Sequence, residues 1–520
     1  MKRIILAIVT LYLAVLNVTL VFAFTPLEEQ GRQLYRSVVS PYGNNITAYV
    51  GQGSVALPAT SVPCIGCHGR DGIGRPEGGL TPSNVTWNNL SKTYGGESAS
   101  GRRFPAYTEK SLYIALTKGL DPAGNRLDPG MPRFDMSMQE VRALIAYLTR
   151  IEEELDPGVF EDRLVVGTLQ PDNALGQVVT AVLTAYFDDI NQNGGVFGRS
   201  LELQVKKLQS ADDLLQQGER LFDSETVFAA INAYTANQDL AFNQLAQRYQ
   251  VPNIGPFTQS PATDEPANNY TFYLFGGDYQ KTRSLLQFAV QQWQLHAEDI
   301  GLVIAKNADN ERLQNKLAND SPSSGKVNDK SGFPSYEMEA MLSKDQIVAM
   351  QQDGVKAVVF YGNADQLQQF AQLSGEVQWY PYVLLPGLSL LQSLVDTDAA
   401  FQQRVFFASS MVASGYSKEG LHKFLQFHQR HKLSQNFIAA QVLAYTAVAV
   451  MVEGIKRTGK QLTRENYIAA LEAIQNLETG MVPPMSFGVN RRLGELGAYV
   501  LMIDSQSGRL KPAVAWQRLD

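Results

Sequence analysis

The residues best suited to chemistry form one pentapeptide, Cys64-Ile65-Gly66-Cys67-His68, which holds both cysteines of the chain and one of its five histidines. C-x-x-C-H is the pattern at which haem is attached covalently. Two thiols at this spacing can each add to a haem vinyl group, and the next side chain can bind the iron as an axial ligand. A thioredoxin-like pair would need a surrounding βαβ pattern, and a zinc site would need further ligands nearby. The motif therefore predicts one covalently attached haem c, with Cys64 and Cys67 as thioether positions and His68 as an iron ligand.

Haem iron takes a second axial ligand, and a methionine in that position raises the potential. Met131, Met136 and Met138 lie in one short region of the sequence. Met131 stands between Gly130 and Pro132, and proline restricts the loop that would present its thioether. Met136 and Met138 are more typical of residues that fill a core or face solvent. We predict Met131 as the second ligand.

Three segments with helical spacing of apolar residues are expected to position these ligands. They cover Glu28–Val38, Thr108–Lys118 and Gln139–Arg150, the last with Ser137 as its cap. The glycine-rich residues 69–74 cannot continue a helix and are expected to pass along the haem edge. Residues 75–105 have few apolar anchors and predict irregular structure.

Composition describes an exported globular protein of more than one domain. The chain has 520 residues, 44% hydrophobic and 18% charged, and a net charge of -7, which does not favour nucleic-acid binding. A basic start, Met1-Lys2-Arg3, precedes an apolar run over residues 4–22, and Val21-Phe22-Ala23 supplies small residues for a signal peptidase. Residues 1–23 therefore predict a signal peptide and a periplasmic location. The alternative is an uncleaved membrane anchor, because the run is long for a signal.

A break at Pro157 and Gly158 separates two regions of different pattern. We predict one domain over 25–152, a linker over 153–161 and a second domain over 162–520. In the second, apolar strands alternate with amphipathic helices, which indicates doubly wound parallel sheets in two α/β lobes. The expected strands include Arg163–Leu169, Leu201–Lys206, Val227–Ile231, Phe272–Phe275, Ile300–Ala305, Ala357–Tyr361, Tyr382–Leu385 and Val405–Ala408, with a polar loop at 319–333 and a final strand pair, Ala498–Asp504 and Leu510–Ala515.

The first domain resembles a class I cytochrome c. The resemblance rests on Gly31 to Tyr35, on Cys64–Gly74, on Gly130–Phe134 and on Leu144–Leu148. It implies an all-α domain, with a few helices around a His/Met-ligated haem, that carries electrons. The segment between the first helix and Cys64 is longer than in the smallest members of this family.

The second domain resembles the type I periplasmic binding proteins of the branched-chain amino acid receptor group, which serve ABC transporters. The resemblance rests on Val165-Val166-Gly167, Gly176-Gln177, Val251–Ile254, Asp353–Tyr361 and, most specifically, the D-I-N-Q-N-G-G-V-F-G of Asp189–Gly198. It implies two lobes, joined by three crossings of the chain, that close on a small solute such as an amino acid.

Seven residues follow strands at places where such proteins bind their ligand, although the loops here differ from the usual pattern. Each also has a local explanation: a turn for Asp172 and Asn173, a helix cap for Thr235, and packing for Tyr279. The candidate solute-binding residues are Asp172, Asn173, Tyr234, Thr235, Asp278, Tyr279 and Tyr361.

Three functions are conceivable for a chain that combines these two domains. The first is an exported electron-transfer cytochrome that a solute-binding module tunes or targets, with a periplasmic dehydrogenase or other cytochromes as redox partners. The second is a solute receptor of an ABC importer with an accessory haem domain. The third, an enzyme, lacks support, because no nucleophilic triad is evident and His428 and His431 have no recognisable acidic companion in the sequence. We expect the first function and no enzymatic activity.

Overall fold

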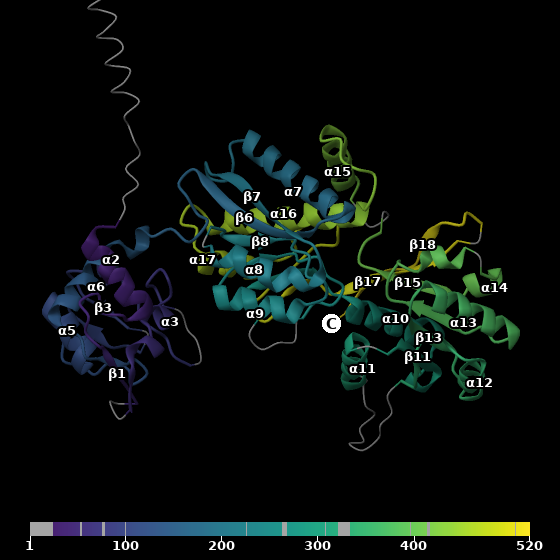
Figure 1. The fold of residues 1–520 in the computed structure, drawn as a ribbon, viewed down its shortest axis with the longest axis horizontal. Coiled ribbons are helices and arrows are strands. Elements are labelled where there is room, and N and C mark those ends of the chain that lie inside the picture. Colours follow the sequence, from purple (N-terminus) through teal and green to yellow (C-terminus); the bar gives the residue numbers. More distant parts are fainter. Residues whose placement is uncertain are drawn as a thin grey trace, which may run out of the picture. The chain divides into compact units, whose positions relative to one another are not determined.

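The computed structural model describes residues 24–519, apart from 52–54, 75–78, 99, 225, 263–267, 307, 321–332, 396, 413–416 and 505. The expected signal peptide and most of the expected loop at 319–333 lie outside the described residues. The chain divides into two compact units between Glu154 and Leu155 (Figure 1). The predicted bounds, 25–152 and 162–520, remain a prediction. Within the expected linker, Asp156 and Val159 are buried in the second unit.

The described residues of the N-terminal unit form the three predicted helices and two short ones. Helix α2 (Pro26–Ser37) packs along α6 (Met138–Arg150), and α5 (Glu109–Lys118) also contacts α6. Helix α3 (Cys64–His68) contains the whole C-x-x-C-H motif, and α4 (Trp87–Leu90) follows it. Leu34, Tyr35, Leu144, Tyr147 and Leu148 are almost fully buried and form the centre of one core.

Capping explains where the three longer helices begin. Each helix is preceded by a hydroxyl residue whose side chain accepts a hydrogen bond from the backbone N–H three residues later. The side chain of that later residue in turn accepts from the backbone N–H of the hydroxyl residue. The pairs are Thr25 with Glu28, Thr108 with Ser111, and Ser137 with Glu140. This reciprocal pattern satisfies donors that a helix start would otherwise leave free. The sequence-predicted helix starts therefore agree with the structure to within two residues.

Short strands supplement the helices of the N-terminal unit, which the sequence predicted as helical alone. Strands β2 (Val55–Pro58), β1 (Thr47–Val50) and β5 (Arg133–Phe134) form an antiparallel sheet in that order, and β3 (Gly96–Glu97) pairs with β4 (Arg103–Phe104). Strands β1 and β2 occupy the long segment before Cys64. The helical expectation missed them because each is at most four residues long, too short to show an alternating pattern.

The second unit is built as two α/β lobes, as predicted. The first sheet is parallel throughout, in the order β16-β10-β9-β8-β6-β7. Helices cover both of its faces: α7 and α16 on one side, and α8 and α9 on the other (Figure 1). The elements are β6 (Arg163–Pro171), α7 (Ala174–Gln192), β7 (Ser200–Leu208), α8 (Leu214–Asp223), β8 (Ala229–Ile231), α9 (Asp239–Tyr249), β9 (Asn253–Ile254), β10 (Thr271–Phe275), α15 (Lys418–Arg430), α16 (Ile438–Thr458), α17 (Arg464–Glu472) and β16 (Leu493–Glu495).

The second sheet has the order β12-β11-β13-β14-β15-β17-β18; its first five strands are parallel, and β17 pairs antiparallel with both β15 and β18. Helices α10 and α11 cover one face, and α12 and α13 the other. The predicted final strand pair is present as β17 and β18. The elements are α10 (Asp278–Trp293), β11 (Ile300–Ala305), α11 (Ala308–Asp320), β12 (Ser335–Met338), α12 (Lys344–Gln352), β13 (Ala357–Tyr361), α13 (Ala364–Glu376), β14 (Tyr382–Leu385), α14 (Ala399–Gln402), β15 (Val405–Ser409), β17 (Gly497–Ile503) and β18 (Leu510–Arg518).

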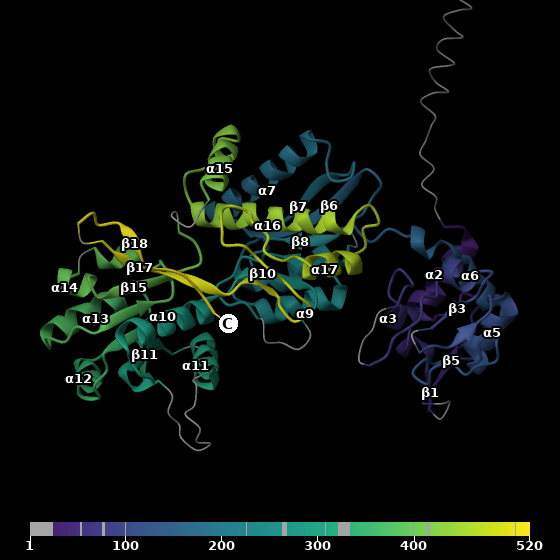
Figure 2. The ribbon, with the colours of Figure 1, turned by 180° about the vertical axis from the view of Figure 1, so that it is seen from behind.

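The chain crosses between the two lobes three times, as the resemblance implied. It passes from β10 to α10, returns between β15 and α15, and passes again from β16 to β17. Figure 2 shows β17 running out of the first lobe into the second. At the last crossing Gly497 has a φ of 150°, and a Cβ there would lie 2.1 Å from the carbonyl oxygen of Gln517.

One described helix, α16, is long and apolar enough to cross a membrane by length and composition. Its most apolar window is 67% buried inside the unit. Val442, Ala447, Val450 and Met451 lie in the core of the first lobe. These contacts are those of a core helix.

Candidate haem site and solute-binding residues

The two cysteines lie on one short helix with free thiols. Cys64 and Cys67 are three residues apart in α3, which places their side chains on neighbouring positions of one helical face. Cys64 is half-buried against the core of the unit, whereas Cys67 is exposed. Burial raises the pKa of the Cys64 thiol to about 12. Two thiols side by side, one against apolar residues and one open, fit the edge of a covalently attached haem.

His68 is oriented by a backbone hydrogen bond. Its Nδ1 atom lies 2.8 Å from the carbonyl oxygen of Ser83. Because a carbonyl can only accept, Nδ1 carries the proton and Nε2 keeps the free lone pair that a metal ion needs. Burial lowers the pKa of His68, with the Ser83 contact acting in the opposite direction, so the neutral ligand form is favoured. This tautomer fits the predicted role of His68 as an iron ligand.

The loop that carries Met131 has a well-supported backbone. The N–H of Met131 donates to the Asp128 carbonyl at 3.1 Å, and the N–H of Gly130 donates to Asp128 Oδ1 at 2.7 Å. The Arg133 guanidinium donates to the carbonyl of Met131 and, at 3.3 Å each, to those of Leu127 and Asp128. The hydrogen bonds hold the loop in one conformation, so its methionine is presented from a fixed position.

The three candidate methionines differ in burial. Met136 is only 3% exposed and belongs to the core, while Met138 is the first residue of α6. Met131 is half-buried against the same core as Cys64 and Ile65. A methionine with an open side and a supported backbone suits a ligand better than one enclosed by protein, so the geometry fits the predicted choice of Met131.

In the first lobe, the candidates follow the neighbouring strands β6 and β8, where the order of a doubly wound sheet reverses. Asp172 and Asn173 have local roles there. Asp172 is exposed and paired with Lys207 Nζ at 2.9 Å, which holds the pKa of its carboxyl below the ordinary value. Asn173 caps α7 by accepting from the N–H of Gly176 at 3.2 Å.

Thr235 lies in a buried polar cluster that the sequence did not indicate. Its hydroxyl donates to Asp239 Oδ2 at 3.0 Å, and Thr258 Oγ1 donates to the same oxygen at 2.6 Å. The other oxygen, Oδ1 of Asp239, is buried without a hydrogen-bond partner among the described residues. Burial raises the pKa of Asp239 to about 6. Tyr234 is half-buried, with its ring stacked 6.0 Å from that of Phe257.

In the second lobe, the structure brings Asp278 and Tyr361 together. Asp278 begins α10 at the first crossing and pairs with Lys281 Nζ at 3.1 Å. Tyr361 ends β13, and its buried hydroxyl contacts Thr282 Oγ1 and lies 3.5 Å from the Asp278 carbonyl. Tyr279 makes different contacts. The guanidinium carbon of Arg283 and Nζ of Lys316 lie 5.9 and 5.7 Å from the centroid of its ring.

The histidine pair has an acidic companion that is distant in sequence. His431 Nε2 lies 2.8 Å from Asp189 Oδ1, and Arg430 pairs with the other oxygen of Asp189. His428 Nε2 lies 2.9 Å from the carbonyl of Ser434. Asp189 is on α7, so these contacts attach α15 to α7. Among the described residues, no group of three or more His, Cys, Asp or Glu side chains is arranged to hold a metal ion.

The comparison with family models decides the identity. Residues 169–508, more than half of the chain, match the family described as periplasmic binding protein. The chain belongs to the periplasmic binding protein family. Residues 60–152 match the cytochrome c family, so a cytochrome c domain precedes the binding-protein module in one chain. No curated protein matches the sequence.

Solved structures similar to the binding-protein module confirm its fold. A fatty acid ABC transporter substrate-binding protein from Thermomonospora curvata has a TM-score of 0.54 and 17% identity, covering 71% of this chain and 95% of its own. A branched chain amino acid ABC transporter structure from Thermus thermophilus with bound valine has a TM-score of 0.52 and 16% identity, covering 69% and 97%. A leucine binding protein from Thermotoga maritima has a TM-score of 0.52 and 15% identity, covering 67% and 97%.

These results confirm both resemblances, the fold class and the combination of a cytochrome c domain with a solute-binding module. Both families consist of binding proteins or electron carriers rather than enzymes, and their members are typically exported. The cytochrome c family implies haem c, and the binding-protein family implies a small-molecule ligand and an ABC transporter partner. The individual site residues and the bounds of the domains stay predictions.

Proposed function

We propose that this protein is an exported c-type cytochrome that carries electrons through one covalently attached haem, and that its binding-protein module takes up a small solute that tunes or targets this electron transfer. The observation that best supports this proposal is the orientation of His68. Its Nδ1 lies 2.8 Å from the Ser83 carbonyl oxygen, which leaves Nε2 to bind iron. Cys64 and Cys67 would hold the porphyrin, and Met131 would supply the second axial ligand. When bound, the haem supplies one-electron redox chemistry.

In this proposal the chain's own residues set the surroundings of the haem. The Ser83 carbonyl fixes the tautomer of His68, and the Arg133 guanidinium holds the carbonyl of Met131 in place. Both contacts would hold the two side chains proposed to bind the iron in one orientation. The periplasm is the compartment in which such haem attachment occurs, and residues 1–23 would direct the chain there.

The solute would bind at the ends of the strands where Tyr234 and Thr235 in the first lobe and Asp278 and Tyr361 in the second are found. Thr235 and Tyr361 already have partners within their own lobes, so they would shape the site more than they would contact the solute. The half-buried Tyr234, Asp278 and Tyr279, with the exposed Asp172 and Asn173, would provide the contacts to the solute.

The second candidate is a solute receptor for an ABC importer with an accessory haem domain. The observation that favours it is the likeness of residues 169–508 to substrate-binding proteins of such transporters, including one with bound valine. The two candidates differ in whether solute binding and the redox state of the iron influence each other.

A spectroelectrochemical titration of the haem, with and without a pool of amino acids and small organic acids, separates the candidates. Coupled binding moves the midpoint potential by about 59 mV for each tenfold difference in solute affinity between the two redox states. We expect a shift in the wild type that is reduced in Tyr234→Ala. A potential unmoved by any component that calorimetry shows to bind would contradict the tuning role and favour the importer receptor. The electron-transfer role fails if the reduced protein passes no electrons to any small cytochrome.

A further inference from the structure

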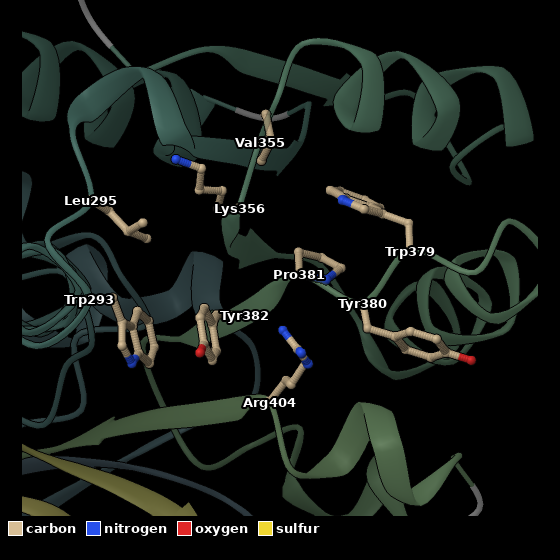
Figure 3. Close-up of a pocket in the computed structure, with 9 residues that line it drawn as sticks. All are labelled: Trp293, Leu295, Val355, Lys356, Trp379, Tyr380, Pro381, Tyr382 and Arg404. Carbon is tan, nitrogen blue, oxygen red and sulfur yellow. The ribbon is translucent and has the colours of Figure 1, made fainter.

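A pocket of about 470 Å³ opens in the second lobe at the edge where strands β13, β14 and β15 begin (Figure 3). Most of the lining residues stand just before these strands or at their first position. Trp293, the last residue of α10, and Leu295 complete the lining. Tyr361 stands at the other end of β13, so the pocket and the proposed solute site lie at opposite edges of one sheet. The lining residues are Trp293, Leu295, Val355, Lys356, Trp379, Tyr380, Pro381, Tyr382 and Arg404.

Three side chains on one side of the pocket form a stack. The rings of Trp293 and Tyr382 are parallel to within 7°, with centroids 3.7 Å apart. The guanidinium carbon of Arg404 lies 5.2 Å from the centroid of Tyr382. Figure 3 shows Tyr382 between the other two, with Trp379 facing the stack from across the pocket. The stack holds the Arg404 side chain in place through a cation–π contact and leaves its N–H groups free to bind an acceptor.

The pocket has a positive charge that the protein does not neutralise. Lys356 Nζ lies 2.8 Å from Asp299 Oδ1, so its charge is compensated. This pairing also holds the pKa of Asp299 below its ordinary value, which keeps that carboxylate ionised. The guanidinium of Arg404, an exposed residue, contacts the Tyr382 ring and has no carboxylate or hydrogen-bond acceptor within the part of the chain that the structure describes. The arrangement therefore favours a ligand with one negative charge.

The volume and the lining side chains of the pocket indicate the size and shape of the ligand. A volume of about 470 Å³ lies in the range of small-molecule sites, which are mostly apolar with a few placed polar groups. The face of Trp379 suits a flat ring, and the planar fork of Arg404 suits a carboxylate that binds through both oxygens. We propose that this pocket is a binding site for a small aromatic carboxylate, separate from the solute site between the strand ends of the two lobes.

Isothermal titration calorimetry on the full-length haem protein tests this, with benzoate as the probe and benzamide as its uncharged counterpart. We expect benzoate to bind and benzamide to bind at least about tenfold more weakly, because the charged hydrogen bonds are lost. Arg404→Gln should weaken benzoate binding by about 10- to 100-fold. The affinity of Arg404→Lys for benzoate should lie between those of the wild type and Arg404→Gln, since lysine keeps the charge and lacks the planar guanidinium. Arg248→Gln, which changes an exposed arginine of the first lobe, should leave benzoate binding unchanged.

Three results would overturn the proposal. The first is no binding of benzoate at millimolar concentration. The second is benzoate binding that Arg404→Gln leaves unchanged while the variant unfolds at the same temperature as the wild type. The third is binding that Tyr234→Ala abolishes and Arg404→Gln does not, because benzoate would then occupy the proposed solute site. The midpoint potential of the haem plays no part in this test, so its outcome is independent of the proposed electron transfer.

Discussion

Gly31 of α2 lies so close to Ala143 of α6 that a Cβ atom at position 31 would stand 2.0 Å from the carbonyl oxygen of Ala143. The same atom would lie 2.7 Å from the Cβ of Tyr147. Helices α2 and α6 of the N-terminal unit therefore touch through their backbones at this point. Only glycine permits that approach, because every other residue places an atom in the contact.

Replacing this glycine should separate the two helices. We expect Gly31→Ala to lower the free energy of unfolding of the cytochrome c domain by about 3 kcal/mol, as overpacking of a close contact does. Denaturant unfolding followed by haem absorption reports on this domain within the full chain. Gln33→Ala, on the exposed side of the same helix, is the matched control and should cost less than about 0.5 kcal/mol. Equal effects of the two changes would show that the helices do not depend on the contact.

Glu154 should stabilise the same domain through charge. Its Oε1 accepts from Arg32 Nε at 2.8 Å and from the Arg36 guanidinium, while Oε2 accepts from the Tyr147 hydroxyl. The carboxylate side chain is only 10% exposed, so Glu154→Gln removes the anion that Arg32 and Arg36 share, although Arg32 keeps Glu29, and should cost about 3 kcal/mol. Glu153→Gln breaks an ion pair whose carboxylate is 61% exposed and should cost less than about 1 kcal/mol. A smaller loss for Glu154→Gln than for Glu153→Gln would contradict this network.

Met131 should raise the midpoint potential of the haem as the proposed second iron ligand. We expect Met131→Leu to remove the absorption band of methionine-ligated ferric haem and to lower the midpoint potential, because methionine ligation raises it. Met136→Leu should keep both properties, since Met136 is 3% exposed and part of the core. Spectroelectrochemistry on the three proteins makes the comparison. If Met136→Leu lost the band and Met131→Leu kept it, the ligand assignment would be wrong.

Asp239 should make the binding-protein module less stable as the pH rises. Its pKa is about 6 in the folded chain against an ordinary 3.8, so ionisation opposes folding as the pH passes from about 4 to above 6. The full penalty corresponds to on the order of 3 kcal/mol. Asp239→Asn removes it, so the variant's gain in stability over the wild type should be small at pH 4 and should grow up to pH 7.

Urea unfolding at a series of pH values, followed by circular dichroism, measures that difference. Asp212→Asn is the matched control, because it removes an exposed carboxyl in place of a buried one. A constant difference for Asp239→Asn would mean that the carboxyl ionises as easily in the folded chain as in the unfolded one.

Local chemistry allowed much of the fold to be predicted from sequence. The haem motif is five contiguous residues, and the caps at Thr108 and Ser137 act within three residues, so their effects are visible without any distant partner. The strands β11, β13 and β14 lie where the apolar runs predicted them, residue for residue, since buried parallel strands read as short, continuous apolar segments. Strand β16 was missed, because its three residues join the first sheet from the far end of the chain.

The amino-acid sequence by itself predicted where a haem would attach, and it determined most of the helices and parallel strands and the presence of two different domains in one chain. These properties depend on covalent spacing and on periodicities within a few residues. Only the tertiary structure decided that Asp239 joins Thr235 and Thr258, that Asp189 faces His431, and that Arg404 stacks on Tyr382. Asp189 and His431 are 242 residues apart, and the segment between Tyr382 and Arg404 includes α14, so only folding brings the side chains of each pair together. Charge compensation and burial, which set the chemistry of these groups, are properties of such contacts.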